Sequence, residues 1–436
     1  MTTDAIYIGI IGCGTVGQGV VKLLQEQREI YAERLGKPIE IARVLVRNAA
    51  AAREVDLPED VLTDDPDIFF DDPRIAIVVE AAGGGDAVSA LLRRALEKRL
   101  PLVTANKALL ASQGSELFAL ARKHDVCIAF EASCGGGIPI LAALKFGLSA
   151  NRIKGVYGIL NGTCNYILTQ MGESGAAYTD ALLEAQELGF AESDPTLDVS
   201  GADAAQKLAI IASLAFGLSI EEREVACQGI DDVRIDDLIY GSELGYVVKL
   251  LAVAERHNGG LVLRVAPCFV HTDEPLAQVR QSFNAISVFG HAVGHTMFYG
   301  RGAGQMPTAS AVVSDLLNVA SGWYGHAFKQ LQIWPDQNRH TDAIDPDQIQ
   351  SRYYFRITTR DEPGGVARIA EALGEHGISI SAILQHEGDD ASWVPLVVTT
   401  HHAREGAVRR ALEQIAQLNV VSGQPVSIRI LDLPEG

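Results

Sequence analysis

The chain of 436 residues is 47% hydrophobic and 21% charged, a composition typical of a globular protein with about two to four domains. With 36 basic and 55 acidic side chains its formal net charge is −19, which disfavours nucleic acid or an anionic membrane as a partner but leaves local binding of an anionic cofactor open. The six cysteines follow no CxxC or zinc-site spacing, so we expect reduced thiols. The N-terminus lacks the features of a signal peptide, and no apolar run reaches the roughly 20 residues of a membrane span. We therefore expect a cytoplasmic protein.

A glycine-rich turn follows the first predicted strand. Residues 5–11 form a short apolar run typical of a buried strand, and residues 18–28 have the periodicity of a helix. Between them lie Gly12, Gly14 and Gly17, in the pattern GxGxxG. Glycines at these positions let the backbone turn tightly and approach a pyrophosphate at the positive end of the helix. The succession of strand, GxGxxG and helix therefore predicts a dinucleotide site.

The second predicted strand, at 39–46, ends at Arg47. A site selective for NAD usually has an acid near this position for the ribose hydroxyls, whereas an arginine can pair with a 2′-phosphate. Arg47 therefore favours NADP over NAD, although an arginine here is equally compatible with a solvated surface. The choice between the two cofactors stays open.

Further strands alternate with helices through the N-terminal third. We predict strands at 75–80, 102–104 and 126–130 and helices at 87–98 and 109–124. This alternation indicates a doubly wound parallel sheet, whose ligands bind beyond the carboxyl ends of the strands. Lys107 follows one such end, so it is a candidate functional residue, although a lysine after a strand is often only solvated.

The segment 131–139 contains Cys134 in a glycine-rich turn. A cysteine flanked by backbone amides could be the nucleophile of an aldehyde dehydrogenase that works through a thioester. Such an enzyme also needs a histidine base, and the nearest upstream histidine is His124, at a predicted helix end. We favour the alternative, in which the glycines form a backbone turn and Cys134 fills a small space.

The middle of the chain carries an acidic segment, 189–207, that ends on a lysine. Its carboxylates are Glu192, Asp194, Asp198 and Asp203, and the lysine is Lys207. Pro195 and Gly201 predict a loop, and a helix is expected from Ser200 onward, which puts Asp203 and Lys207 one turn apart on one face. Apolar neighbours would desolvate the Lys207 ammonium, as in an active site, but a solvated ion pair is an equal possibility. Upstream, Thr163 could contact a polar ligand or cap the helix predicted to run to 171.

Mixed α and β patterns follow. Residues 245–254, 261–267 and 283–289 are predicted to be strands of an open sheet in a separate substrate domain. A second glycine-rich loop opens an apolar helix within 300–317, and a helix start of this kind can hold an anionic ligand or close over a cofactor.

The last part of the chain follows a polar, proline-containing linker at 335–347. Its predicted order of elements is βαββαβ, which is ferredoxin-like. With the turn at 361–365 this part resembles an ACT domain, a module that commonly binds amino acids, and Gly364 and Gly365 are the candidate contacts. A dimerisation domain without a ligand is the alternative.

Five segments together resemble homoserine dehydrogenase: 11–17, 104–107, 131–139, 189–207 and 302–310. The most specific is 189–207, with the pattern Gly-Phe-x-Glu-x-Asp-Pro-x-x-Asp followed by Gly-x-Asp-x-x-x-Lys. The resemblance implies an NAD(P)-dependent enzyme that interconverts L-homoserine and L-aspartate 4-semialdehyde on the route to threonine and methionine. It also implies feedback inhibition through the ACT domain, with threonine as effector.

The resemblance also implies roles for individual residues. Lys207 would donate and accept the proton with Asp203 as its partner, and Lys107 would lie between nicotinamide and substrate. Glu192 and Asp198, with Thr163 nearby, would bind the substrate ammonium. The cofactor would contact Thr15, Val16 and Gly304 beside the three glycines of the first turn. A sodium ion would be held mainly by backbone carbonyls of Glu131, Cys134, Gly136 and Ile138.

We therefore expect a Rossmann-type doubly wound sheet, an α+β substrate and dimerisation domain, and a ferredoxin-like ACT domain. The expected boundaries are 1–130 for the dinucleotide-binding domain, 131–330 for the catalytic domain, 331–350 for the linker and 351–436 for the ACT domain. A helix near 303–320 is expected to return to the first domain. A homodimer or homotetramer is expected. A non-enzymatic amino-acid sensor is the alternative from a different functional class.

Overall fold

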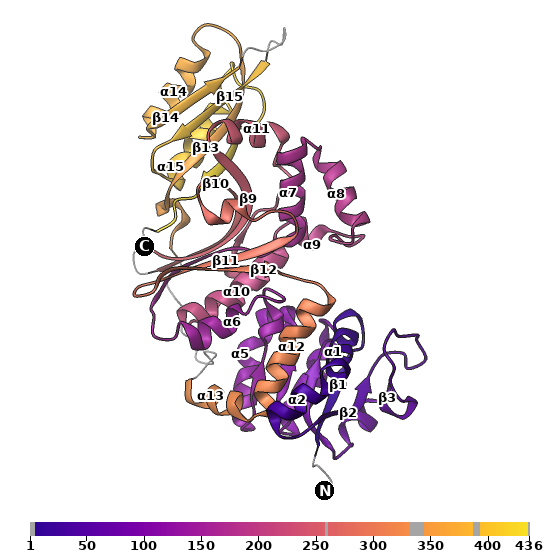
Figure 1. Cartoon of the computed structure of the whole chain (residues 1–436). Coiled ribbons are helices and arrows are strands. Elements are labelled where there is room, and N and C mark those ends of the chain that lie inside the picture. Colours follow the sequence, from indigo (N-terminus) through magenta and orange to yellow (C-terminus); the bar gives the residue numbers. More distant parts are fainter. Residues whose placement is uncertain (1–4, 258–259, 332–343, 387–392, 435–436) are drawn as a thin grey trace. The chain divides into compact units, whose positions relative to one another are not determined.

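The computed structural model describes residues 5–257, 260–331, 344–386 and 393–434 (Figure 1). It divides into two compact units. The first comprises Met1–Gly162, Asp203–Ala226 and Phe283–His340, and the second comprises Thr163–Ala202, Cys227–Ser282 and Thr341–Gly436.

The first unit contains a parallel sheet with strand order β3-β2-β1-β4-β5-β6. Its strands are β1 (Ile6–Ile11), β2 (Ile39–Leu45), β3 (Leu62–Thr63), β4 (Ile75–Glu80), β5 (Leu102–Thr104) and β6 (Ile128–Ala129). The order reverses between β1 and β4, and ligands of such sheets bind at this switch point, outside the carboxyl ends. The predicted doubly wound sheet is confirmed.

Helices accompany this sheet, among them those predicted at 18–28, 87–98, 109–124 and near 303–320. They are α1 (Thr15–Glu26), α2 (Arg28–Leu35), α3 (Pro66–Phe70), α4 (Asp86–Glu97), α5 (Lys107–Lys123), α12 (Gln305–Ala320) and α13 (Trp323–Leu331). Helix α12 comes from late in the chain and lies beside α1 (Figure 1). A Cβ on Gly19 would lie only 3.0 Å from Ala309 Cβ, so glycine at this position permits the close approach of the two helices.

The first unit also contains an antiparallel group of strands, β12-β11-β7. They are β7 (Ile153–Ile159), β11 (Phe283–Gly290) and β12 (Gly294–Arg301), with the short helix α6 (Ile140–Ala142) before them. Helix α10 (Ala202–Phe216) is apolar on most of its surface and almost fully buried. Any charged side chain on α10 is therefore placed in a desolvated environment.

The second unit begins with helices and continues with a sheet. Its helices before the C-terminal part are α7 (Gly162–Ser174), α8 (Tyr178–Glu187), α9 (Thr196–Val199) and α11 (Ile235–Glu243). Its long strands are β9 (Tyr246–His257) and β10 (Gly260–His271), which lie where strands were predicted and pair antiparallel. A two-residue strand, β8 (Ala226–Cys227), precedes them. Helix α9 lies within the segment that we predicted as loop, and the next helix begins two residues after the predicted start at Ser200, whose Oγ accepts a bond from Ala202 N–H.

The C-terminal part of the second unit has the predicted βαββαβ order. Its elements are β13 (Gln350–Arg360), α14 (Gly365–Glu375), β14 (Ile380–Gln385), β15 (Trp393–Thr400), β16 (Ala403–Arg404), α15 (Glu405–Ile415) and β17 (Val426–Ile430). The sheet order is β17-β13-β15-β14, and Phe355, Ile357, Leu373 and Leu396 are at the centre of the core. Most of the predicted linker at 331–350 lies outside the described residues.

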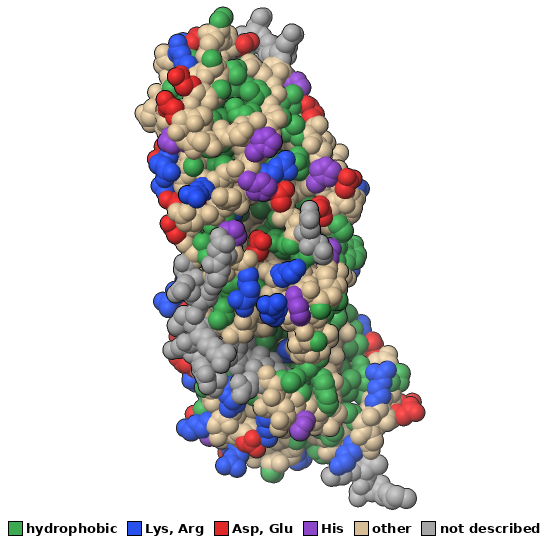
Figure 2. All heavy atoms as spheres, turned by 90° about the vertical axis from the view of Figure 1, so that its left-hand side faces the viewer, with side chains coloured by type: hydrophobic (Ala, Val, Ile, Leu, Met, Phe, Trp, Pro, Cys, Tyr) green, Lys and Arg blue, Asp and Glu red, His purple; other side chains and the backbone are tan. Residues whose placement is uncertain are grey.

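Charged side chains of both signs are interspersed on the face drawn in Figure 2. Among the described residues no helix has both the length and the apolar character needed to cross a membrane.

Candidate active site

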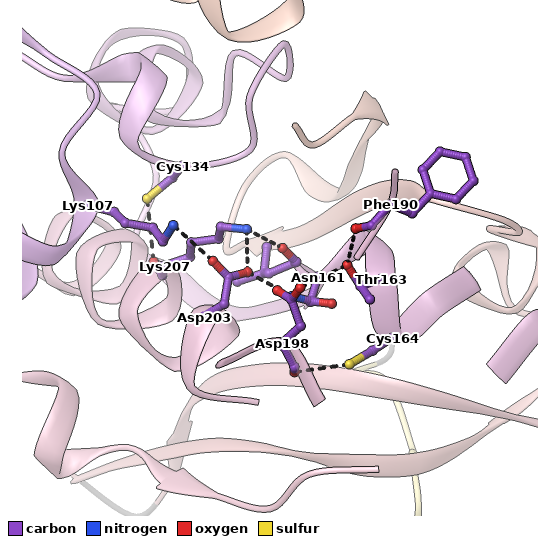
Figure 3. Close-up of polar contacts among 10 residues, drawn as sticks. Lys107, Cys134, Asn161, Thr163, Cys164, Phe190, Asp198, Asp203 and Lys207 are labelled. Carbon is purple, nitrogen blue, oxygen red and sulfur yellow. Dashed lines mark hydrogen bonds and ion pairs between the residues drawn. The ribbon is translucent and has the colours of Figure 1, made fainter. Parts of the chain in front are cut away.

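Lys207 and Asp203 form a buried ion pair on α10. Each residue is 9% exposed, because the surrounding helix positions are apolar and packed. Lys207 Nζ donates to Asp203 Oδ2 at 2.7 Å and to the carbonyl oxygen of Leu160 at 2.8 Å (Figure 3). An ammonium has three N–H groups, so these two bonds, made within the described part of the chain, leave one N–H for a substrate oxygen.

Asp203 joins two lysines from distant parts of the chain. Its Oδ1 lies 3.1 Å from Lys107 Nζ, and its Oδ2 also accepts a hydrogen bond of 2.9 Å from Asn161 Nδ2. Burial by itself raises the pKa of this carboxyl, but the charges of Lys207 and Lys107, with hydrogen bonds from Lys207 and Asn161, outweigh burial and hold the pKa well below its usual range. Asp203 is therefore ionised at neutral pH and positions both ammonium groups.

Lys107 follows the carboxyl end of β5, as predicted, and lies three residues after Thr104. It is the first residue of α5, which begins two residues before the predicted start at 109. The side chain of Asn106 caps the helix by accepting a bond from Leu109 N–H at 3.2 Å. The Lys107 side chain is 37% exposed, against 11% for that of Lys207. The two lysines therefore differ in environment: Lys107 is partly exposed beyond the carboxyl end of β5, and Lys207 is buried.

Residues of the predicted substrate group lie in the second unit. Thr163 Oγ1 is 2.7 Å from the carbonyl oxygen of Phe190 and 3.1 Å from Asp198 Oδ2 (Figure 3). Asp198 is partly buried, and its carbonyl accepts a bond from the Cys164 thiol at 3.1 Å. Glu192 is exposed. The structure thus joins Thr163 to Asp198 and leaves the Glu192 carboxylate accessible.

The glycine-rich turn before α1 has the geometry that a pyrophosphate requires. Gly12 has φ +92°, and a Cβ there would lie 2.5 Å from the backbone of Ala82. A Cβ on Gly17 would lie 2.3 Å from the carbonyl oxygen of Gly12. A Cβ on Gly14 would meet nothing within 4 Å, so this glycine borders open space beside the helix N-terminus. The residues present fit a dinucleotide.

The other predicted cofactor residues lie at the positions that the sequence indicated. Thr15 and Val16 open α1, and Arg47 is exposed two residues after the end of β2. Gly304, with φ +117°, directly precedes α12. These positions leave each of them accessible to a bound dinucleotide.

The loop that begins at Glu131 is buried, and the Glu131 carboxylate already accepts hydrogen bonds from the backbone. The Glu131 carboxylate accepts bonds from Leu141 N–H at 2.8 Å and Ala142 N–H at 2.6 Å, and its own N–H donates to Asp315 Oδ2 at 2.7 Å. Burial raises the pKa of Glu131 to about 7. No group of three or more His, Cys, Asp or Glu side chains suited to a metal occurs among the described residues. The loop can therefore offer a cation mainly carbonyl oxygens, including those of Gly136 and Ile138.

Cys134 is a poor nucleophile in this structure. It is 1% exposed, its thiol donates to the carbonyl of Lys207 over 3.7 Å, and burial raises its pKa to about 12. The structure therefore supports the predicted filler role. We expect Cys134→Ala to retain most activity in a steady-state assay. Phosphate-dependent acylation of the substrate, abolished by this substitution, would instead establish a thioester enzyme.

Gly364 and Gly365 lie at the start of α14. Gly364 has φ +91°, a left-handed conformation that favours glycine, and it precedes the first residue of the helix. No side chain caps the start of α14, where Gly365 is buried and its N–H donates to the carbonyl oxygen of Glu362 at 3.2 Å.

One residue that contacts the ion pair had no role in the sequence analysis. Asn161 precedes α7 and donates to Asp203, yet its spacing to Asp203 follows no helical or strand period. Only the three-dimensional structure brings this pair together.

Comparisons with known proteins give a consistent result. Residues 139–317 match the family model for homoserine dehydrogenase, residues 12–131 match its NAD binding domain, and residues 353–419 match the ACT domain. The chain is 43% identical to a homoserine dehydrogenase of Synechocystis sp. over 435 residues, which cover 98% of this chain and 99% of that protein.

Solved structures agree with these matches. A homoserine dehydrogenase from Thiobacillus denitrificans is similar with a TM-score of 0.90 and 39% identity, covering 98% of each chain. A hyperthermophilic archaeal homoserine dehydrogenase in complex with NADPH is similar with a TM-score of 0.61 and 25% identity, covering 72% of this chain and 97% of that one.

Proposed function

Because this chain belongs to the homoserine dehydrogenase family, we propose that its Lys207–Asp203 pair exchanges the proton when L-homoserine and L-aspartate 4-semialdehyde are interconverted. The enzyme is an NAD(P)-dependent oxidoreductase. One observation supports this assignment most strongly: the Lys207 ammonium is buried beside an ionised carboxylate and keeps an N–H for a ligand.

The chemistry needs a hydride at carbon and a proton at oxygen. When bound, the nicotinamide supplies or accepts the hydride. In aldehyde reduction, Lys207 polarises the carbonyl with an N–H···O hydrogen bond and donates its proton as the oxygen gains negative charge. In alcohol oxidation, the neutral amine accepts the hydroxyl proton. Asp203 fixes the position of Lys207 in both directions, and Lys107 shares the polarisation from the nicotinamide side.

The cofactor is proposed to bind at the switch point of the parallel sheet. Its pyrophosphate would lie at Gly12, Gly14, Thr15, Val16 and Gly17, with Gly304 closing from the α12 side. The exposed Arg47 would meet a 2′-phosphate, which favours NADP. The carbonyl oxygens of Glu131, Cys134, Gly136 and Ile138 are proposed to hold Na⁺, because carbonyls suit a hard monovalent cation better than the occupied Glu131 carboxylate would.

Glu192 and Asp198 are proposed to bind the substrate ammonium, with Thr163 orienting the Asp198 carboxylate. We expect Glu192→Gln to raise the KM for homoserine by roughly tenfold with little change in kcat, since one charge-assisted hydrogen bond is weakened. The measurement is steady-state kinetics at saturating cofactor. Glu187→Gln, an exposed acid on α8, is the matched control. An unchanged KM would remove Glu192 from the site.

The ACT domain is proposed to bind threonine at Gly364 and Gly365 and to transmit feedback inhibition. The exposed Gly364, in a left-handed conformation, turns the chain into α14, and the positive end of that helix suits an amino-acid carboxylate. We expect calorimetric titration to detect saturable threonine binding and the assay to detect reduced turnover. A domain that binds no amino acid and only joins subunits would give neither signal.

A homodimer or homotetramer is also proposed. Its mass can be measured by analytical sedimentation.

The direct test of the function is a steady-state assay with homoserine and each nicotinamide, with and without threonine. We expect cofactor reduction that depends on homoserine. No homoserine-dependent absorbance change with either cofactor would favour a non-enzymatic amino-acid sensor.

A further inference from the structure

A buried carboxylate lies at the carboxyl end of β4, beside the strand that leads to Lys107. Glu80 is 0% exposed and accepts bonds from Ala82 N–H at 2.7 Å and Gly83 N–H at 3.2 Å on Oε1. Its Oε2 accepts a bond of 2.5 Å from the Thr104 hydroxyl. Burial raises the pKa of this carboxyl, and the surrounding hydrogen bonds oppose the rise. A group this costly to bury requires a structural or catalytic reason.

The contacts of Thr104 indicate what that reason is. Thr104 is the last residue of β5 and 1% exposed. While its hydroxyl donates to Glu80, its Oγ1 accepts a bond of 3.0 Å from Asn106 N–H. Asn106 in turn caps α5, and the next residue is Lys107. A continuous line of hydrogen bonds therefore runs from Glu80 through Thr104 and Asn106 to the backbone that presents Lys107.

We propose that Glu80 and Thr104 are positioning residues that fix the turn before α5 and thereby hold Lys107 against Asp203. The proposal rests on the role proposed above for Lys107. Because a displacement of about 1 Å can cost on the order of 100-fold in rate, a turn of three residues that carries a catalytic lysine needs such a restraint. The Glu80–Thr104 bond supplies it across two neighbouring strands of the sheet.

The hydroxyl of Thr104 is the part of this line that can be removed with little change in shape. We expect Thr104→Val to lower kcat by about tenfold or more, while Thr104→Ser, which keeps the hydroxyl, stays within about threefold of the unmodified enzyme. The affinity for the cofactor, measured by fluorescence titration, should change by less than about threefold, because the Thr104 side chain is 1% exposed and its hydroxyl bonds to Glu80 and Asn106. Ser89→Ala removes another buried hydroxyl, bonded to Gln113 at 2.7 Å, and should keep kcat unchanged.

A double-mutant cycle decides whether the effect passes through Lys107. In a Lys107→Ala background, Thr104→Val should cost less than about twofold further in kcat. An equal loss in both backgrounds, or an unchanged kcat for Thr104→Val alone, would overturn the proposal. An inactive unmodified enzyme, or a Lys107→Ala variant with full activity, would instead count against the proposed function.

Glu80→Gln provides a second variant if Thr104→Val does not fold. The amide oxygen can accept from Ala82 N–H, and the amide nitrogen can donate to Thr104 Oγ1, which also accepts from Asn106 N–H, so the contacts are kept with the direction of the bond between residues 80 and 104 reversed. We expect kcat within about threefold of the unmodified enzyme. A loss of tenfold or more would mean that the charge of Glu80 acts directly, contrary to a positioning role.

Discussion

Lys207→Ala is expected to lower kcat for homoserine oxidation by about 10²–10⁴-fold, the usual contribution of a positioned acid–base group. The substitution removes the buried ammonium beside Asp203 that is proposed to transfer the proton. The KM for homoserine should change much less, because the carboxylates proposed to bind the substrate ammonium remain. The measurement is steady-state turnover at saturating cofactor, with folding checked by circular dichroism.

Lys249→Met is the matched control, because Lys249 is also a buried lysine but donates to Asn165 and the carbonyl oxygen of Val279, to which no role in the chemistry is assigned. It is 4% exposed in β9, bonds to Asn165 Oδ1 at 3.1 Å, and burial lowers its pKa to about 8. Folded Lys249→Met protein should keep kcat within about threefold. Equal losses in the two variants would show that the removal of any buried ammonium disturbs turnover.

Arg356→Met is expected to destabilise the second unit by about 3–5 kcal/mol. Arg356 of β13 donates from Nε to Asp237 Oδ1 at 2.7 Å and from Nη2 to Oδ2 at 3.1 Å. The Tyr354 hydroxyl also donates to Asp237, and the Asp237 side chain is fully buried. Removing the guanidinium leaves that carboxylate without its counter-charge. The measurement is the urea midpoint, followed by circular dichroism.

The double variant Arg356→Met/Asp237→Leu separates two causes of a lower stability: the unpaired charge of Asp237 and the lost contacts of the Arg356 side chain. It removes both charges, so most of the stability should return, apart from about 1 kcal/mol for the cap that Asp237 gives to Arg234 N–H and about 1–3 kcal/mol for the buried Tyr354 hydroxyl, which loses its acceptor. A midpoint for Arg356→Met equal to that of the unmodified protein would mean that the carboxylate is neutralised in another way.

The local parts of the fold and site could be predicted from the sequence. Asp203 and Lys207 are one helical turn apart, so their pairing follows from helix geometry alone. The GxGxxG turn lies between a recognisable strand and helix, and the alternation after residue 350 matches the ACT elements. Five segments of the sequence indicate the family, and the comparisons confirm that family.

The long-range contacts could not be predicted in the same way. Lys107 and Asn161 reach Asp203 from other elements, and only the packed fold fixes those distances. The Glu80–Thr104 bond joins two strands that are neighbours only in the finished sheet. Helix α9 was missed because Pro195 and Gly201 dominate a segment too short to show a helical period.

The most direct test is a single-turnover measurement of hydride transfer, in which enzyme with pre-bound cofactor is mixed rapidly with homoserine, for the unmodified enzyme and for folded Lys207→Ala. Single-turnover kinetics separate the chemical step from substrate binding and product release. Our account predicts that the rate of this step falls by at least about 100-fold in the variant. Equal single-turnover rates for the two proteins would contradict the assignment of proton transfer to Lys207.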